Sequence, residues 1–352
     1  MMYQIEKAQA VWGGDAAADS YRIFRHGFQW DGNGKIRLEI SADSTFEVLI
    51  NGSVLPIQQV ADFPGDRTFS SLDVTGYLHP GTNEIIVSVH FIGEDFLTYR
   101  VGVPYLQTVV CSGEKILSAT GPGWEYSSDT PYRSGLKCKV TNQLGFVFEY
   151  DAGKIPGTWQ PVQTVHPAGT LHPRSVPQLL ELPRPQPALV QFGVLKRAGE
   201  KSTFAETCSE DYLKVVDYDR LFASARREEG TYRSRKFHLD GKTPFVFNPL
   251  SAFSGADGFY VICDQGCETE GYLTFRLDAP AGTLVDIVHG EHLEDGRVRG
   301  FVGGRNFTDR YHCRAGLNEF TFRHRRLGAR YLELHVTGCG GGPGCGPPRG
   351  QA

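Results

Sequence analysis

The sequence predicts an all-β protein made of two tandem β-sandwiches. Apolar residues occur in short runs that alternate with polar residues or end at turn residues, which is typical of strands. Aromatic residues are frequent, with 22 Phe and 15 Tyr, and the 42 Gly and 20 Pro supply many tight turns. Because a single hydrophobic core rarely serves a chain of 352 residues, we expect two domains and a connector between them.

The first predicted domain, residues 1–155, contains two clear strand signals. In the first signal, apolar residues occupy every second position, which is the period of a half-buried strand. These positions are Ile36, Leu38, Ile40, Phe46, Val48 and Ile50. Asn51-Gly52 tolerates positive φ at both central positions of a type I′ turn, so the chain should return there as a hairpin. The second signal, residues 85–91, is almost continuously apolar, as in a central strand. Further strands are expected near 99–105 and 145–150.

Residues 156–235 are predicted to form the connector. Eight prolines lie between positions 156 and 187, and each lacks a backbone donor. This stretch therefore cannot pair as an interior strand and should run extended along the surface of its neighbours. A partial apolar stripe over residues 209–227 predicts one short helix.

The second predicted domain, residues 236–338, again consists of short strands bounded by turns. The expected strands are residues 245–247, 258–262, 272–277, 284–289, 320–322 and 331–336. Their spacing of roughly ten residues is typical of a sandwich. Residues 339–352 are rich in Gly and Pro and carry too few apolar residues to fold, so we expect a disordered or aberrant tail, such as the product of a shifted reading frame.

Composition excludes several classes of partner. The net charge of −4 argues against nucleic acid and against anionic membranes, because both require a basic face. No stretch approaches the roughly 20 apolar residues of a membrane span, and the N-terminus lacks the apolar segment of a signal peptide. The eight cysteines are scattered and are expected to be reduced thiols of a cytoplasmic protein.

Many short segments in both halves resemble bacterial α-L-rhamnosidases of glycoside hydrolase family 78. In the first half they are Phe24-Arg25-His26-Gly27-Phe28, Leu49-Ile50-Asn51-Gly52, Pro80-Gly81-Thr82-Asn83 and Phe148-Glu149-Tyr150-Asp151-Ala152. In the second half they include Gly271-Tyr272-Leu273, Ala279-Pro280-Ala281-Gly282-Thr283, Asp309-Arg310-Tyr311 and Arg330-Tyr331-Leu332-Glu333-Leu334. The resemblance extends to about residue 338 and departs from the family at Ala329, where an aromatic residue is usual.

The resemblance implies a jelly-roll or galactose-binding-like first sandwich and a concanavalin-like second one. In the family, terminal α-L-rhamnosyl groups are hydrolysed in an (α/α)₆ barrel that follows the second sandwich and holds the catalytic acids. The resemblance therefore implies that this sequence ends before the barrel, and we assign no catalytic residue. The expected partners are that missing barrel and a rhamnose-containing glycoside or polysaccharide.

Two local clusters are candidate sites. Trp30, Asp31 and Asn33 combine an aromatic ring with polar side chains on one loop, which suits a sugar ring and its hydroxyls. The alternative is an Asx turn beside a partly buried Trp. Glu291, Glu294 and Asp295 could form a loop that docks onto the barrel. The alternatives for this loop are a solvated hairpin and, for a complete hydrolase, a catalytic pair of carboxylates.

No metal site or cofactor is predicted. Cys263 and Cys267 lack a second Cys/His pair at zinc-finger spacing, and His289 and His292 are not expected to bind metal. The favoured function is the non-catalytic sandwich region of a rhamnosidase. The rivals are an independent carbohydrate-binding module and a complete hydrolase that uses Glu291.

Overall fold

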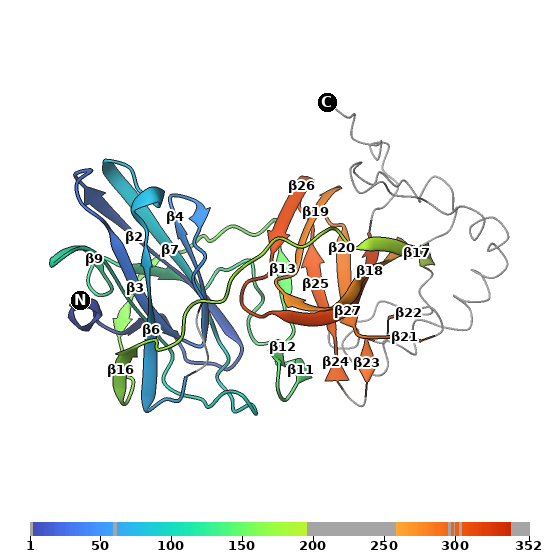
Figure 1. Cartoon of the computed structure of the whole chain (residues 1–352), viewed down its shortest axis with the longest axis horizontal. Helices are drawn as coiled ribbons and strands as arrows, with labels where there is room; N and C mark the ends of the chain where they lie inside the picture. Colours follow the sequence, from blue (N-terminus) through green and yellow to red (C-terminus); the bar gives the residue numbers. More distant parts are fainter. Residues whose placement is uncertain are drawn as a thin grey trace.

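A computed structural model describes residues 3–58, 62–195, 258–294, 297–298, 300–302 and 305–338. Within these ranges the regular structure consists of β-strands and two 3₁₀ turns, η1 (Ile5–Lys7) and η2 (Thr75–Tyr77), so the predicted all-β class is confirmed. Figure 1 shows two β regions side by side, one from the N-terminal half and one from the C-terminal half. The predicted helix at 209–227, the predicted strand at 245–247 and the tail at 339–352 lie outside the described residues.

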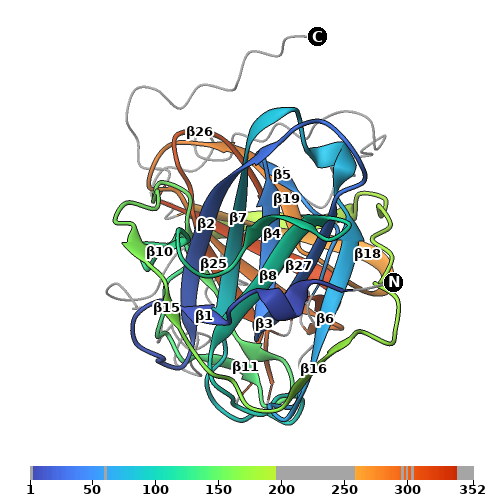
Figure 2. The same cartoon turned by 90° about the vertical axis from the view of Figure 1, so that its left-hand side faces the viewer.

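The first region is a sandwich of two sheets, each built from strands of different lengths (Figure 2). The first sheet, sheet A, runs in the order β15 (Gln163–Thr164), β1 (Val11–Trp12), β8 (Tyr105–Ser112), β3 (Arg37–Asp43), β6 (Asp66–Asp73) and β16 (Thr170–Pro173), with β9 (Lys115–Ala119) also paired to β8. The second, sheet B, runs β14 (Gln160–Pro161), β10 (Glu125–Ser127), β2 (Ser20–Trp30), β7 (Gly81–Phe91), β4 (Thr45–Ile50) and β5 (Ser53–Val54).

The predicted strand pattern explains the core of this sandwich. In β4, Phe46, Val48 and Ile50 are buried while the residues between them are half-buried. Asn51 and Gly52 have φ of +49° and +79°, as a type I′ turn requires, and the predicted hairpin from β4 to β5 is confirmed. The predicted central strand is β7, which pairs with β2 on one side and β4 on the other.

The second region is centred on a six-stranded sheet, sheet E. Its order is β13 (Glu149–Asp151), β25 (Thr308–His312), β20 (Leu284–Gly290), β27 (Leu327–Thr337), β18 (Gly258–Gly271) and β17 (Ala188–Leu195). The two-stranded antiparallel sheet of β19 (Thr274–Ala279) and β26 (Gly316–Thr321) shares an apolar core with one face of sheet E. Three further two-stranded pairs are β11 (Lys139–Thr141) with β12 (Gly145–Phe146), β21 (Leu293–Glu294) with β22 (Arg297–Val298), and β23 (Phe301–Val302) with β24 (Arg305–Asn306).

Three details differ from the expected organisation. β13, which was assigned to the first domain, pairs in parallel with β25 of sheet E. The expected strand at 99–105 is instead β8, which begins at Tyr105. The proline-rich connector does form short strands, but each of β14, β15 and β16 lies at a sheet edge, where missing donors are tolerated.

The two regions meet where a loop after β26 contacts the outer face of sheet B. The His324 ring is fully buried there, with Nδ1 3.1 Å from Thr45 Oγ1 and Nε2 3.2 Å from Ser88 Oγ. Beside it the rings of Tyr21 and Tyr132 stack at 4.6 Å. Tyr21 and Tyr132 belong to the same hydrophobic cluster as the core of the second region, so this core is completed by the first region.

Candidate functional site

In the structure, the predicted sugar site at Trp30, Asp31 and Asn33 is a buried ring beside a turn and not an open binding surface. The Trp30 ring is only 8% exposed and lies in the core of the first sandwich, and its Nε1 donates to the Asn33 carbonyl at 2.9 Å. This burial contradicts the predicted role of Trp30 as a stacking platform, because a ring inside the core cannot offer its face to a ligand. The Asp31 carboxylate accepts from the Asn33 N–H at 3.0 Å and from Lys115 Nζ at 3.1 Å, so it forms an Asx turn.

The predicted docking loop is only partly described. The Glu291 side chain is 58% exposed, with His292 Nε2 3.9 Å from its carboxylate. Glu294 belongs to β21, where its backbone pairs with Arg297. Asp295 lies outside the described residues. The structure thus brings Glu291 into the solvated turn that was the alternative expectation, and the docking role stays a prediction.

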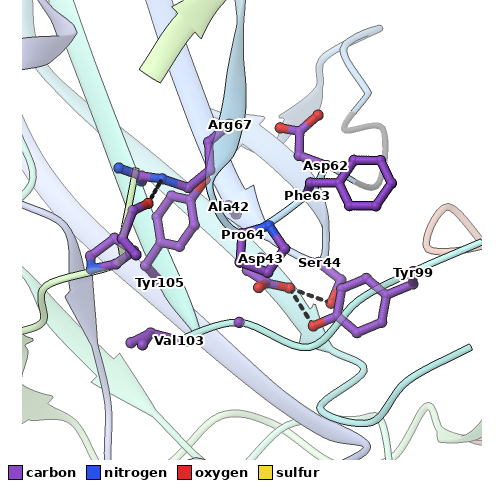
Figure 3. A pocket seen from close by; sticks show the side chains of 13 residues that line it. Ala42, Asp43, Ser44, Asp62, Phe63, Pro64, Arg67, Tyr99, Val103 and Tyr105 are labelled. Atoms are coloured by element: carbon purple, nitrogen blue, oxygen red, sulfur yellow. Dashed lines mark hydrogen bonds between the residues drawn. The ribbon is translucent and has the colours of Figure 1, made fainter. Parts of the chain in front are cut away.

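A cavity of about 230 Å³ opens at one end of sheet A, and sequence reasoning did not predict it. Figure 3 shows side chains from several separate segments converging on it. The lining residues are Ala42, Asp43, Ser44, Asp62, Phe63, Pro64, Arg67, Tyr99, Gly102, Val103, Tyr105, Pro167 and Ala168. They come from the end of β3, the start of β6, the start of β8 and the loops beside them, so only the folded sandwich brings them together.

Asp43 is the central acid of this cavity. Its Oδ1 accepts hydrogen bonds from Tyr99 Oη and from Ser44 Oγ, both at 2.7 Å (Figure 3). Burial raises the pKa of Asp43 to about 6, although the two hydroxyl donors act in the opposite direction. Among the described residues no group donates to its other oxygen, Oδ2, which faces Gly102. Asp43 is therefore a positioned acceptor with one oxygen still available.

Arg67 provides the opposite charge. Only 8% of this residue is exposed, its Nε donates to the Ala168 carbonyl at 3.1 Å, and its guanidinium lies 4.8 Å from the centre of the Tyr105 ring. The buried Nη1 of Arg67 has no hydrogen-bond partner within the described residues. Because this atom is sealed from solvent, it does not line the open cavity, and the charge of Arg67 acts on Asp43 only through space.

Asp62 and Phe63 complete the rim. Both carboxylate oxygens of Asp62 are used by Thr68, whose backbone N–H donates at 2.6 Å and whose hydroxyl lies 3.1 Å away. Phe63 follows directly and is 70% exposed. The sequence signal that could have indicated this rim is Asp62-Phe63-Pro64-Gly65, an aromatic residue displayed on a Pro-Gly turn beside an acid.

The two Cys263 and Cys267 thiols sit on β18, which bulges around Gly266. Burial raises the pKa of the Cys263 thiol to about 11, so this thiol is a poor metal ligand. His289 is completely buried, which lowers its pKa to about 3. Within the described residues no helix is long and apolar enough to cross a membrane.

Comparison with known proteins shows which domain and which solved structures this chain resembles. Residues 256–339 match the family model of the bacterial alpha-L-rhamnosidase concanavalin-like domain. The GH78 rhamnosidase of Bacillus sp. GL1 superimposes with a TM-score of 0.72 at 19% identity, covering 94% of this chain and 53% of that enzyme. No curated protein sequence matches the chain.

Two further enzymes share the fold over the same part of the chain. The α-L-rhamnosidase of Aspergillus terreus has a TM-score of 0.58 at 17% identity, covering 94% of this chain and 34% of that enzyme. For the Streptomyces avermitilis α-L-rhamnosidase, complexed with L-rhamnose, the TM-score is 0.53 at 19% identity, with 93% and 28% covered. The predicted resemblance and the predicted β-sandwich fold are thus confirmed, and the chain spans about half of the Bacillus enzyme and a third or less of the other two.

Proposed function

We propose that this chain is the non-catalytic β-sandwich region of a rhamnosidase-related glycoside hydrolase and that it does not hydrolyse glycosides by itself. The observation that carries the proposal is the match of residues 256–339 to the rhamnosidase concanavalin-like domain, within a fold shared along 94% of the chain. A sandwich buries its own core and leaves rigid edges and loops on which a large helical domain can pack.

The chemistry of the exposed carboxylates supports this proposal. Glycoside hydrolysis needs two carboxyl groups on opposite sides of the sugar, and one of them must be held protonated. The Glu291 side chain is 58% exposed and lies 3.9 Å from the still more exposed ring of His292. A carboxylate in that setting is solvated and lacks the burial that would hold its proton, so Glu291 is poorly suited to act as the general acid.

The connector supplies the surface expected to face a further domain. Four of its apolar side chains lie within seven positions and are exposed in the described chain: Val176 (57%), Leu179 (49%), Leu180 (84%) and Leu182 (71%). Clustered exposed apolar side chains are unusual on an isolated domain and are typical of a covered surface. We propose that this surface contacts the catalytic domain. It predicts that the isolated chain binds a hydrophobic dye and self-associates, whereas monodisperse behaviour without dye binding at high concentration would contradict it.

The decisive test is hydrolysis of an aryl α-L-rhamnoside by the purified chain. The proposal predicts nitrophenol release at the enzyme-free rate. A rate above this background that is lost in Glu291→Gln, but kept in the matched exposed variant Glu84→Gln, would establish the rival reading of a complete hydrolase. Both substitutions exchange an exposed carboxylate for an amide, so folding effects should cancel.

The second candidate function is an independent carbohydrate-binding module. The cavity beside Asp43 favours it, because it combines a positioned acceptor, Asp43, with aromatic walls from Phe63, Tyr99 and Tyr105. The earlier candidate site does not, because Trp30→Ala should unfold the first sandwich rather than remove a binding surface.

A further inference from the structure

We propose that Asn33 is a site of spontaneous covalent modification, where water converts the side-chain amide into a carboxylate. The sequence contains two Asn-Gly pairs, Asn33-Gly34 and Asn51-Gly52, and the folded chain protects the second pair and leaves the first reactive. This inference is independent of the proposed function, because it concerns the chemistry of one loop and its test measures no sugar binding and no hydrolysis.

The reaction uses the Asn side chain, the next peptide nitrogen and water. The backbone nitrogen attacks the side-chain carbonyl carbon, a new C–N bond closes a cyclic imide, and the side-chain nitrogen leaves with the displaced proton as ammonia. Water then opens the imide at either carbonyl, the ring nitrogen regains a proton, and the product is aspartate or isoaspartate. A following glycine favours the attack, because it has no Cβ beside the attacking nitrogen.

The fold itself requires both glycines. Gly34 has φ of +78°, and a Cβ at this position would lie 2.8 Å from Ser112 Oγ. Gly52 has φ of +79° in the turn between β4 and β5. Both positions lie in the left-handed region that favours glycine. The two pairs therefore share the same kind of nucleophile, and the surroundings of each Asn side chain decide which pair reacts.

The Asn51 amide is held at both of its polar atoms. Its Nδ2 donates to the Tyr77 carbonyl at 3.0 Å and to Asn83 Oδ1 at 2.8 Å, and its Oδ1 accepts from the Glu84 N–H at 3.0 Å. Asn83 is only 1% exposed, so this partner is itself fixed. Closing the imide rotates the Asn51 amide away from its partners, so these bonds must break before the reaction can proceed.

The Asn33 amide has no such restraint. The residue is exposed, and its side chain makes no hydrogen bond within the part of the chain that the structure describes. Its backbone is ordered, because the N–H donates to Asp31 Oδ1 at 3.0 Å and the carbonyl accepts from Trp30 Nε1 at 2.9 Å. That carbonyl and the Gly34 nitrogen belong to one peptide plane. The bond from Trp30 is therefore the link that ring closure strains at Asn33, against three side-chain bonds at Asn51.

The modification changes the charge and the path of the loop. Both products carry a carboxylate beside Asp31, whose own carboxylate already pairs with Lys115 at 3.1 Å. In isoaspartate the main chain runs through the former side chain and gains a methylene directly before Gly34. Because Gly34 already fits closely against Ser112, the modified loop has to shift.

The experiment incubates the full chain at mildly alkaline pH, once folded and once in denaturant, and follows both Asn-Gly peptides by mass spectrometry. In denaturant the two sites should convert at similar rates. In the folded chain, Asn33 should convert within about fivefold of its unfolded rate, as for the strain of one hydrogen bond. Asn51 should be slowed by about thirtyfold or more, as for the loss of two or more such bonds.

Two variants test the cause of the difference. Asn33→Gln should stop conversion at this site, because the longer side chain closes an imide far less readily, and should leave the rate at Asn51 unchanged. Asn83→Ala removes one partner of the Asn51 amide and should raise the folded-state rate at Asn51 by about fivefold. Thermal unfolding shows whether each variant folds. If Asn83→Ala does not fold, the comparison of the folded and unfolded parent chain carries the test.

Either of two results would overturn the proposal. The first is that Asn51 converts as fast as Asn33 in the folded chain, which would mean that its hydrogen bonds give no protection. The second is that folding slows Asn33 as much as Asn51, which would mean that the ordered backbone of the Trp30 loop is itself protective.

Discussion

The two β regions bury charge in different ways. In the first sandwich, the fully buried carboxylate of Glu39 accepts from the backbone N–H groups of Gln4 and Ile5, both at 2.8 Å, and from Arg37 on its own strand at 2.7 Å, so it anchors the N-terminal segment onto sheet A. In the second region, buried charges pair with other side chains on sheet E. Asp286 and Arg310 lie 2.6 Å apart on neighbouring strands, and Glu333 contacts both Arg297 and His335.

The strand period explains this difference. Along β20 and β27, Val285, Ile287 and Val336 face the apolar core shared with the paired strands β19 and β26. The alternate positions, Asp286 and Glu333, therefore occupy the opposite face of sheet E and are also buried. One face of sheet E is thus apolar, and the other combines buried ionic pairs with a small apolar cluster that includes Val288 and Ile262. A buried ionic layer contributes little net stability when intact but costs much when one partner is removed.

The pKa of Glu333 depends on two opposing effects in this layer, burial and the nearby ionic partners. Burial alone would raise the pKa of this carboxyl, but the charge of Arg297 and the hydrogen bond from His335 outweigh burial and lower the pKa to about 2. A carboxyl with a lowered folded-state pKa stabilises the fold above its unfolded pKa of about 4.5, and that stabilisation is lost as pH falls towards 2. We expect the second region to be the more acid-sensitive part.

The largest expected effect comes from breaking the ionic layer. Glu333→Ala removes the carboxylate between Arg297 and His335, and we expect a loss of about 3–5 kcal/mol in unfolding free energy by denaturant titration. The control is Glu270→Ala, whose ion pair with Arg326 is exposed and should be worth less than about 1 kcal/mol. Equal losses in the two variants would mean that the buried layer has no special role.

A cavity made in the core of the first sandwich should lower the free energy of unfolding slightly less than Glu333→Ala does. Leu38 is completely buried between sheets A and B, so Leu38→Ala should lose about 3 kcal/mol, within the usual range for such truncations. Because no ionisable group is removed, the loss should be the same at pH 4 and pH 7, unlike the loss in Glu333→Ala. A pH-dependent effect of Leu38→Ala would remove the contrast between the regions.

A smaller effect, of opposite sign, is expected where the regions meet. Burial raises the pKa of Glu47 to about 7, and the nearby Arg323 only partly opposes this. A raised carboxyl pKa means that stability present below about pH 4.5 is lost as pH rises through 7. Glu47→Gln should therefore gain roughly 1–3 kcal/mol at pH 8 and nothing at pH 4. A loss of stability at pH 8 would show that the ion pair with Arg323 outweighs burial.

The smallest effect is expected on the surface. Asp31 forms an Asx turn and an exposed contact with Lys115. Asp31→Asn should leave the thermal unfolding midpoint unchanged, because the amide oxygen can still accept the Asn33 N–H. A clear decrease in the midpoint would assign this turn a structural role in the first sandwich.

Local patterns predicted most of the fold. The alternation in residues 36–50 identified β3 and β4, and the Asn51-Gly52 turn identified the hairpin from β4 to β5, because such strands are defined by their own sequence. β13 was misplaced for the opposite reason. Its three residues carry no signal of which sheet they join, and the parallel pairing with β25 depends on a contact across 161 positions, between Glu149 and Arg310.

The candidate site could not be predicted in the same way. Trp30 was chosen because it stands beside polar loop residues, but the alternation along β2 directs its ring into the core. Asp43, Arg67 and Tyr99 belong to three separate segments, and each looks ordinary in its own sequence context. Only the pairing of β3 with β6 and β8 brings them to one cavity.

The contrast between the buried charges of the two regions is tested most directly by amide hydrogen exchange of Glu333→Ala against the parent chain. The account predicts that protection falls in β18, β20 and β27 of sheet E, which surround the altered carboxyl, while β2 and β7 of the first sandwich stay protected. An equal loss of protection in both regions would contradict it and show that the chain unfolds as one cooperative unit.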